Sequence, residues 1–289
     1  MKIKNECIPC MVRQAVEAAE LMSNDKAMQE RMIKAGLDAI SKIDFSETAP
    51  EVARGIHNMV KKITGNPDPY KELKDFYNRV ATELVVEMAL ESKILESSNP
   101  FDTACRLSIA GNIIDFGVGI DLDKSDVHRS LHESLTSPLY GTPIEALKEA
   151  VERANRILVL ADNSGEIVFD KLLMLQLPME RTTYVVKGGP MVNDATMEDA
   201  LEVGMTDLVR VIDTGEAVQG TILKDCSEAF IAEFEAADLI LSKGQANYET
   251  LSDLNDPRIF YLLRAKCKSI AEDIGCIKGS FVITQKLDA

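Results

Sequence analysis

The spacing of hydrophobic positions divides the chain into two parts that meet near Arg156. In the first part, apolar residues recur at three- and four-residue intervals, which is typical of amphipathic helices. The pattern predicts helices over residues 10–22, 25–40, 49–63 and 70–91.

The last of these predicted helices has the clearest boundary and the clearest apolar stripe. The breaker Gly65–Pro69 precedes it, so we expect Asp68 as its N-cap and Pro69 at its first helical position. We expect its stripe to pack into the core; the stripe consists of Phe76, Val80, Leu84, Val85 and Met88.

The second part alternates short β-rich runs with helical segments. This alternation is typical of crossover units, in which a mostly parallel sheet is covered on both faces. We therefore predict a three-layer α/β/α, doubly wound fold with a helical N-terminal cap subdomain at 1–95 and an α/β domain at 96–289. The predicted strands are 157–160, 182–186, 208–212, 239–241, 259–263 and 281–283.

Polar residues and glycines follow the first four predicted strands. Because the carboxyl ends of parallel strands share one edge of a sheet, these groups should converge on one crevice beneath the cap. A helix beginning near Glu166 would aim its first N–H groups at an anion held there. The four groups are Asp162-Asn163-x-Gly165-Glu166; Lys187-Gly188-Gly189 with Asn193-Asp194; Asp213-Thr214-Gly215; and Lys243-Gly244-x-x-Asn247.

Carboxylate and amide oxygens are hard ligands that suit Mg²⁺ or Mn²⁺. We predict a divalent metal ion on Asp162, Asn163 and Asp194, with the ammonium of Lys243 or Lys187 neutralising phosphate oxygens. The pattern favours metal-assisted phosphoryl transfer to water. Any one group taken alone could equally consist of a helix cap and a turn.

The remaining candidate residues have more specific predicted roles. Asp213 is the candidate general base, or the residue that orients Asn163 or Lys243. Asn112 and Asp115 lie one helical turn apart and either contact substrate or form a buried polar clamp between cap and sheet. Arg106 is a candidate phosphate ligand or a surface residue. The substrate-binding set is Arg106, Asn112, Asp115, Glu166, Lys187, Gly188, Gly244 and Asn247.

Composition narrows the class of protein. With 289 residues, 46% of them hydrophobic, the chain can bury a sizeable core. Its formal net charge of -15 argues against a nucleic-acid partner. No apolar stretch approaches the ~20 residues of a membrane span, and no secretory signal is visible, so we expect a cytoplasmic protein without a membrane partner.

The six cysteines, in a chain without a secretory signal, argue against a disulfide framework. Cys7 and Cys10 have the spacing of a redox or metal motif. A second, structural metal there would need further ligands, and Cys267 and Cys276 supply them only if the two ends of the chain meet.

In the order of its motifs the sequence resembles the damage-control metal-dependent phosphatase family, catalogued earlier as domain of unknown function 89. The matching blocks are the four groups above, extended to Tyr248, together with Gly111-Asn112-Ile113-Ile114-Asp115. The N-terminal Cys7-x-x-Cys10 resembles the prokaryotic subfamily in particular.

The resemblance implies a Mn²⁺, Ni²⁺, Co²⁺ or Mg²⁺ ion on Asp162, Asn163 and Asp194, and a small phosphorylated metabolite, such as a sugar phosphate or a damaged phospho-metabolite, as substrate. Two alternatives stay open. One is an S-adenosylmethionine-dependent carboxyl methyltransferase, an activity proposed for another member of that family. The other is a non-catalytic metal- or redox-sensing protein that depends on Cys7 and Cys10. The oligomeric state is not predicted.

Overall fold

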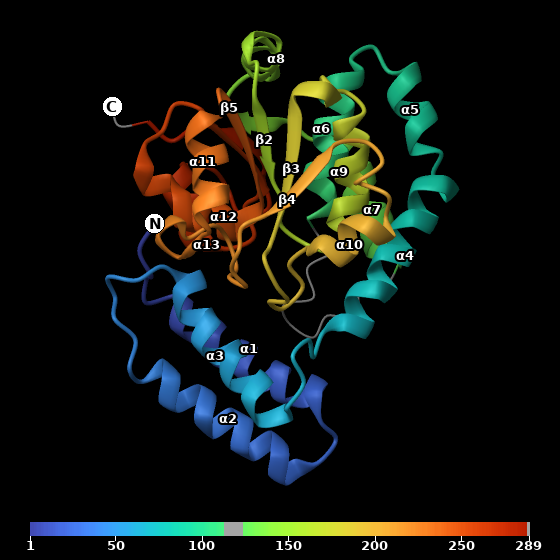
Figure 1. The fold of residues 1–289 in the computed structure, drawn as a ribbon. Coiled ribbons are helices and arrows are strands. Elements are labelled where there is room, and N and C mark those ends of the chain that lie inside the picture. Colours follow the sequence, from blue (N-terminus) through green and yellow to red (C-terminus); the bar gives the residue numbers. More distant parts are fainter. Residues whose placement is uncertain (113–123, 288–289) are drawn as a thin grey trace.

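The computed structural model describes residues 1–112 and 124–287 (Figure 1). Its strands are β1 (Leu139–Gly141), β2 (Ile157–Leu160), β3 (Thr182–Val186), β4 (Arg210–Asp213), β5 (Leu239–Lys243), β6 (Ile259–Arg264) and β7 (Phe281–Thr284). Its α-helices are α1 (Cys7–Met22), α2 (Lys26–Ile40), α3 (Ala49–Thr64), α4 (Lys71–Glu87), α5 (Leu90–Glu96), α6 (Pro100–Gly111), α7 (Lys124–Thr136), α8 (Ile144–Arg153), α9 (Glu166–Met174), α10 (Met197–Glu202), α11 (Glu228–Ala236), α12 (Gly244–Leu251) and α13 (Lys268–Ile274).

The strands of the described residues form one sheet in the order β1-β7-β6-β5-β2-β3-β4. All neighbouring pairs are parallel except β6 and β7, which are antiparallel. From β2 the chain builds outward through β3 and β4, then returns to place β5 on the other side of β2. Ligands bind at such a switch point in open α/β sheets, so the carboxyl ends of β2 and β5 are the expected site.

Side chains on the two faces of the central strand β2 pack in two different apolar clusters. Ile157 and Val159 pack in the apolar cluster that includes α6 and α9. Leu158 and Leu160 pack in the cluster formed with α11, α12 and α13. Figure 1 shows these helix groups on opposite sides of the sheet. The predicted three-layer α/β/α fold is therefore confirmed, and the alternation of side chains along a strand is its physical basis.

The helices α1–α3 lie together at one end of the molecule (Figure 1) and have apolar clusters of their own. Helix α3 is well delimited, because Thr48 and Glu51 form a capping box at its start and Gly65 ends it with φ 69°. In contrast, α4 and α5 contribute Tyr77, Leu84 and Leu90 to the main core. The domain division at residue 95 stays a prediction.

Helix α4 differs from its prediction in three respects. Because Ala89 has φ 50° and separates it from α5, helix α4 ends at Glu87 and not at residue 91. It begins at Lys71 after Tyr70 as N-cap, while Asp68 accepts the N–H of Tyr70 (3.3 Å) from outside the helix. Phe76 is 48% exposed, so its predicted place in the core is wrong. The buried face runs instead through Lys74, Tyr77, Asn78, Ala81 and Leu84. Hydrophobicity alone could not reveal a face whose polar members have buried partners.

Two further findings concern the chain as a whole. The three-residue strand β1 at the sheet edge was not predicted, because a short and half-exposed strand has little hydrophobic pattern. Among the helices of the described ranges, none combines the length and the apolar character needed to span a bilayer.

Candidate functional site

The loops that follow β2 and β3 are bound to each other by backbone hydrogen bonds. The N–H of Ala195 donates to the carbonyl of Asp162 (2.9 Å), and the N–H of Ser164 donates to that of Asn193 (2.8 Å). Asn163 and Asp194 form an antiparallel bridge. The three predicted metal ligands Asp162, Asn163 and Asp194 are therefore brought together, and all three are buried.

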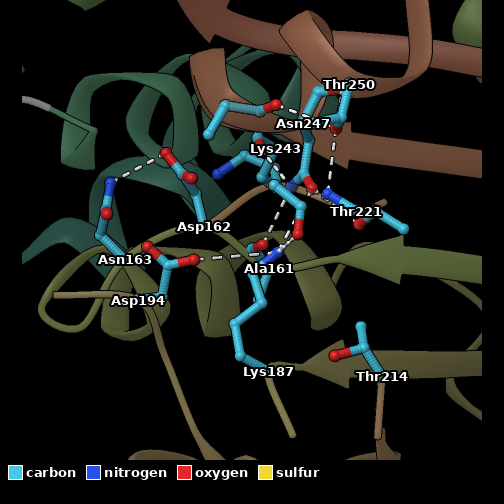
Figure 2. Close-up of polar contacts among 12 residues, drawn as sticks. Ala161, Asp162, Asn163, Lys187, Asp194, Thr214, Thr221, Lys243, Asn247 and Thr250 are labelled. Atoms are coloured by element: carbon cyan, nitrogen blue, oxygen red, sulfur yellow. Dashed lines mark hydrogen bonds and ion pairs between the residues drawn. The ribbon is translucent and has the colours of Figure 1, made fainter. Parts of the chain in front are cut away.

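The carboxylate of Asp162 is at the centre of this arrangement (Figure 2). Its Oδ2 accepts hydrogen bonds from Nδ2 of Asn112 and Nδ2 of Asn163, each at 2.8 Å. The same two amides also donate to Oε2 of Glu166, at 2.6 and 3.2 Å. Asn112 thus links the end of α6 to the site, as expected of a buried polar clamp.

Gly244 at the start of α12 packs directly on Asp162. A Cβ at Gly244 would lie 1.8 Å from Oδ2 of Asp162, and the residue has φ 77°, so only glycine fits there. The close approach joins the ends of β2 and β5 at the switch point.

A second group, which we name the Lys243 cluster, contains Lys243, Glu166, Asp170, Ser108 and Tyr184. The ammonium of Lys243 donates to Oε1 of Glu166 (2.6 Å), to Oδ1 of Asp170 (2.5 Å) and to the carbonyl of Ser108 (3.3 Å). The hydroxyls of Ser108 and Tyr184 donate to Asp170 at 2.6 and 2.7 Å. Every member is fully buried.

The pKa values of Lys243 and Glu166 are both raised, but for different reasons. Burial alone would lower the pKa of Lys243, but the carboxylates of Asp170 and Glu166 raise it above its usual range. Burial raises the pKa of Glu166 to about 7; Lys243 opposes this rise, while Asp162 and Asp170 add to it. Lys243 therefore keeps its proton, and the ionised form of Glu166 is disfavoured.

Lys187 lies in a different environment at the end of β3. Its ammonium donates to the carbonyl of Gly220 (2.6 Å) and to Oδ1 of Asn247 (3.3 Å), while Oδ2 of Asp194 is 4.0 Å away. Asn247 in turn donates to the carbonyls of Ala161 (3.0 Å) and Lys243 (2.7 Å). Figure 2 shows Asn247 between these two lysines.

The donor set fits a hard divalent cation. Asp162, Glu166 and Asp170 are three buried carboxylates, of which Glu166 and Asp170 contact the ammonium of Lys243, so their combined negative charge exceeds the positive charge that Lys243 supplies. Buried charge of one sign is costly, and a divalent ion would offset it. Asp162, Asn163 and Asp194 offer the carboxylate and amide oxygens that such an ion prefers.

The comparisons with known proteins agree over the whole length of the chain. The model of the damage-control phosphatase ARMT1-like domain matches residues 3–282. The chain belongs to this family.

Several relatives of this family member are similar along almost their entire length. An uncharacterised protein of Methanocaldococcus jannaschii is 38% identical over 99% of this chain and 96% of its own length. Damage-control phosphatases of Pyrococcus horikoshii and Archaeoglobus fulgidus are 35% and 34% identical, each over 98% of this chain and over 97% and 98% of their own lengths.

A solved structure supports the fold directly. The crystal structure of a DUF89 family protein from P. horikoshii superposes with a TM-score of 0.87 at 33% identity, covering 99% of both chains. The resemblance inferred from the motifs is confirmed, and the names of the relatives support a phosphatase role for this damage-control phosphatase family member.

The structure removes two predicted residues from the crevice. Arg106 donates to Asp102 (2.7 Å) and to the carbonyls of Ser134 (3.0 Å) and Ser137 (2.5 Å), so it fastens α6 to the end of α7 and is not placed as a phosphate ligand. Asp213 is exposed on the edge strand β4, where its Oδ1 accepts the N–H of Gly215 at 2.8 Å. Strands β3 and β2 separate it from Lys243, so it does not orient that residue.

Three further predictions have different outcomes. Asp115 lies outside the described residues. Gly188 packs against the loop after β4, where a Cβ would lie 2.3 Å from the backbone carbon of Gly215; its contact with phosphate stays a prediction. Within the ranges described, no group of three or more His, Cys, Asp and Glu side chains is arranged to hold a metal ion. The second metal at Cys7 and Cys10 is therefore not supported, and the predicted catalytic metal relies on the amide of Asn163.

Sequence reasoning missed two residues that support the site. Asp170 lies on α9 between two buried apolar stretches, 167–169 and 172–174, and an acid at such a position is the signal that it has a buried partner. Asn78 on α4 accepts the N–H of Gly165 (2.7 Å) and donates to Asp199 (2.9 Å), which also accepts from Ser164 (3.0 Å). These bonds anchor the start of α9.

A cavity of about 950 Å³ lies at the amino-terminal ends of the strands, on the side of the sheet away from the candidate site. It is lined by residues from the amino ends of β2, β3 and β4, among them Arg156, Arg181 and Arg210. Neither Asp162 nor Lys243 lines this cavity, so the cavity is separate from the candidate site.

Proposed function

We propose that the chain is a divalent-metal-dependent phosphatase that hydrolyses small phosphorylated metabolites. The observation that carries this proposal is the convergence of Asp162, Asn163 and Asp194 at the switch point of the sheet, beside a buried excess of negative charge. A phosphate group at this position would meet the carboxylates of Asp162 and Asp194, and a divalent cation would offset their repulsion.

Asp162, Asn163 and Asp194 would hold the metal. When bound, the ion would supply a Lewis acid for the phosphate oxygens and lower the pKa of a bound water. The reaction joins the oxygen of water to phosphorus and breaks the bond to the ester oxygen, which leaves with a proton as an alcohol.

Residues of the chain itself would attract the phosphate group and orient the proposed metal ligands. Lys187 donates to two neutral oxygens and lies 4.0 Å from the carboxylate of Asp194, so its ammonium would attract a phosphate oxygen held beside Asp194. Lys243 holds Glu166, whose other oxygen orients the amides of Asn112 and Asn163 next to Asp162. In this scheme Lys243 acts on the site through Glu166, and Gly244 leaves room for Asp162.

The test is phosphate release from an aryl phosphate and a panel of sugar phosphates, with Mn²⁺, Co²⁺, Ni²⁺, Mg²⁺ or a chelator. We expect activity that requires a metal and is lost in Asp162→Ala and Asp194→Ala. Asp38→Ala is the matched control, because Asp38 is an exposed acid on α2. Activity that survives both site substitutions would overturn the proposal.

Further measurements on wild type and on variants at Asp162, Cys7 and Cys10 test the methyltransferase and the sensing protein as alternatives. A methyltransferase would bind S-adenosylmethionine without metal and transfer its methyl group to a carboxylate. A sensing protein would tolerate Asp162→Ala and lose its response in Cys7→Ser and Cys10→Ser. Either result, together with no phosphate release under any metal, would replace the phosphatase proposal.

A further inference from the structure

The turn from Pro190 to Asp194 contains a strained residue next to a predicted metal ligand. Val192 has φ 47°, in the left-handed region, and is 2% exposed. A β-branched side chain crowds the backbone in this conformation, so valine is a genuine outlier there. Strain of this kind persists only where the surrounding structure forces it, and it concentrates at functional sites.

Residues of the N-terminal helices and of the link that follows them contact one side of this turn. The ammonium of Lys61 on α3 donates to the carbonyl of Pro190. Tyr70, in the link between α3 and α4, forms a buried apolar cluster with Met191 and Val192. The hydroxyl of Tyr70 is in turn hydrogen-bonded to Nδ1 of His57 (3.1 Å) on α3.

The proposed active site holds the other side of the turn. The N–H of Asp194 donates to the carbonyl of Met191 (3.0 Å), which closes the turn around Val192. The carbonyl of Asn193 then accepts the N–H of Ser164, and Asp194 bridges to Asn163. The strained residue therefore lies between contacts with the N-terminal helices and contacts with the loop that contains Asp162.

We propose that Tyr70 is a positioning residue, which holds Val192 in its left-handed conformation and so sets Asp194 beside Asp162 and Asn163. Lys61 assists by fixing the carbonyl at the start of the turn. This inference rests on the proposed function, since it assigns the N-terminal helices a role in the affinity for the metal. Without the contact, Val192 would relax toward an extended or helical conformation and Asp194 would turn away.

The test measures Mn²⁺ binding by calorimetry in the full chain for wild type, Tyr70→Ala, Val192→Gly and the double variant. We expect Tyr70→Ala to weaken binding about tenfold, as the loss of an outer contact of a metal site does. Val192→Gly should bind like wild type, because glycine adopts the turn without strain. In the double variant, glycine should restore most of the affinity lost in Tyr70→Ala.

The double variant distinguishes a positioning role of Tyr70 from simple packing, because the two roles predict opposite effects of Val192→Gly on Mn²⁺ affinity when Tyr70 is replaced. If Tyr70 only fills space, Val192→Gly removes more packing and the double variant binds more weakly than Tyr70→Ala. That result, or wild-type affinity in Tyr70→Ala, overturns the inference. If Tyr70→Ala does not fold, Lys61→Met takes its place in the same cycle, with the same rescue expected and the same outcomes overturning it.

Two controls complete the experiment. Met11→Ala removes a buried side chain of the same helices, within a cluster that shares no residue with that of Tyr70, Met191 and Val192, so it should lower thermal stability and leave Mn²⁺ affinity unchanged. Asp194→Ala tests the metal site itself. If its affinity equals that of wild type, or if wild type binds no Mn²⁺, the proposed function fails and the inference fails with it. If only the Tyr70 cycle gives the wrong sign, the proposed function stands.

Discussion

Lys243 and His57 are both buried ionisable groups, yet their surroundings drive their charges in opposite directions. Lys243 has two carboxylates within hydrogen-bonding distance, and they raise its pKa although burial alone would lower it. His57 has the hydroxyl of Tyr70 as its partner, and burial together with the charge of Lys61 lowers its pKa from 6.5 to about 4. Partners, rather than burial, decide which buried group stays charged.

The difference teaches how the two sides of the proposed site are built. The side of Lys243 is held by charges that must be compensated, so removing one charge leaves others unpaired. The side of His57 and Tyr70 is held by apolar contact, by the hydrogen bond between these two neutral groups and by the ammonium of Lys61, with no buried carboxylate to compensate among the contacts that the structure describes there, so it tolerates small losses but not a new charge. Three experiments test this contrast.

The largest effect is expected from Lys243→Met. The substitution keeps most of the side-chain volume but leaves Glu166 and Asp170 buried without their ammonium partner. We expect a loss of about 3–5 kcal/mol in the free energy of unfolding, measured in urea with a chelator present.

Lys34→Met is the matched control for this measurement. Lys34 is an exposed lysine paired with Glu30 on α2, and its loss should change the free energy of unfolding by no more than about 0.5 kcal/mol. If Lys243→Met were as mild, the carboxylates would not depend on the ammonium, and the contrast with His57 would be wrong.

The second experiment follows the stability of the protein with pH. Between pH 6.5 and about 4 the unfolded chain protonates His57 while the folded chain does not, so the unfolded state binds more protons. As the pH falls through this window, the titration of His57 therefore lowers the free energy of unfolding, by roughly 3 kcal/mol in total.

The difference between wild type and His57→Gln isolates this contribution from the other groups that titrate in the same range. Glutamine can keep a hydrogen bond to Tyr70 but cannot take up a proton. We expect the two stability curves, measured by urea unfolding at each pH, to diverge below pH 6.5. Parallel curves would mean that His57 is not kept neutral by burial.

The smallest effects come from a matched pair of tyrosines. Tyr184→Phe deprives Oδ2 of Asp170, a buried carboxylate, of its 2.7 Å donor, and should cost about 1.5–3 kcal/mol. Tyr70→Phe removes a hydroxyl from the neutral ring of His57 and should cost about 0.5–1.5 kcal/mol. Thermal unfolding of both variants checks the order; a reversed order would contradict the contrast between charged and neutral partners.

Much of the fold could be predicted from local patterns. The apolar run Ile157–Leu160, which Asp162 follows, predicted the central strand, because a strand buried on both faces must be apolar throughout. The prediction for Phe76 was wrong because hydrophobicity did not identify the buried face of α4. On this helix the aromatic Phe76 is exposed, while the polar Lys74 and Asn78 are buried.

The candidate site was predicted less completely. Asp162, Asn163 and Asp194 were grouped correctly, since they follow adjacent parallel strands. Lys243 was predicted as a catalytic residue and Lys187 as a substrate-binding residue, and only the structure shows that Lys243 is enclosed by carboxylates while Lys187 donates to the carbonyl of Gly220. Asp213 seemed as well placed as either, but the strand order puts it on the edge strand.

The amino-acid sequence by itself determined the fold class, the family and the position of Asp162, Asn163 and Asp194 after adjacent strands, because these depend on periodicity and on the order of short motifs. The tertiary structure alone decided that Asp170 and Tyr184 surround Lys243, that Arg106 lies outside the crevice, and that Tyr70 meets Val192. These contacts join residues far apart in the chain, and the packing of helices against the sheet, rather than any local pattern, brings them together.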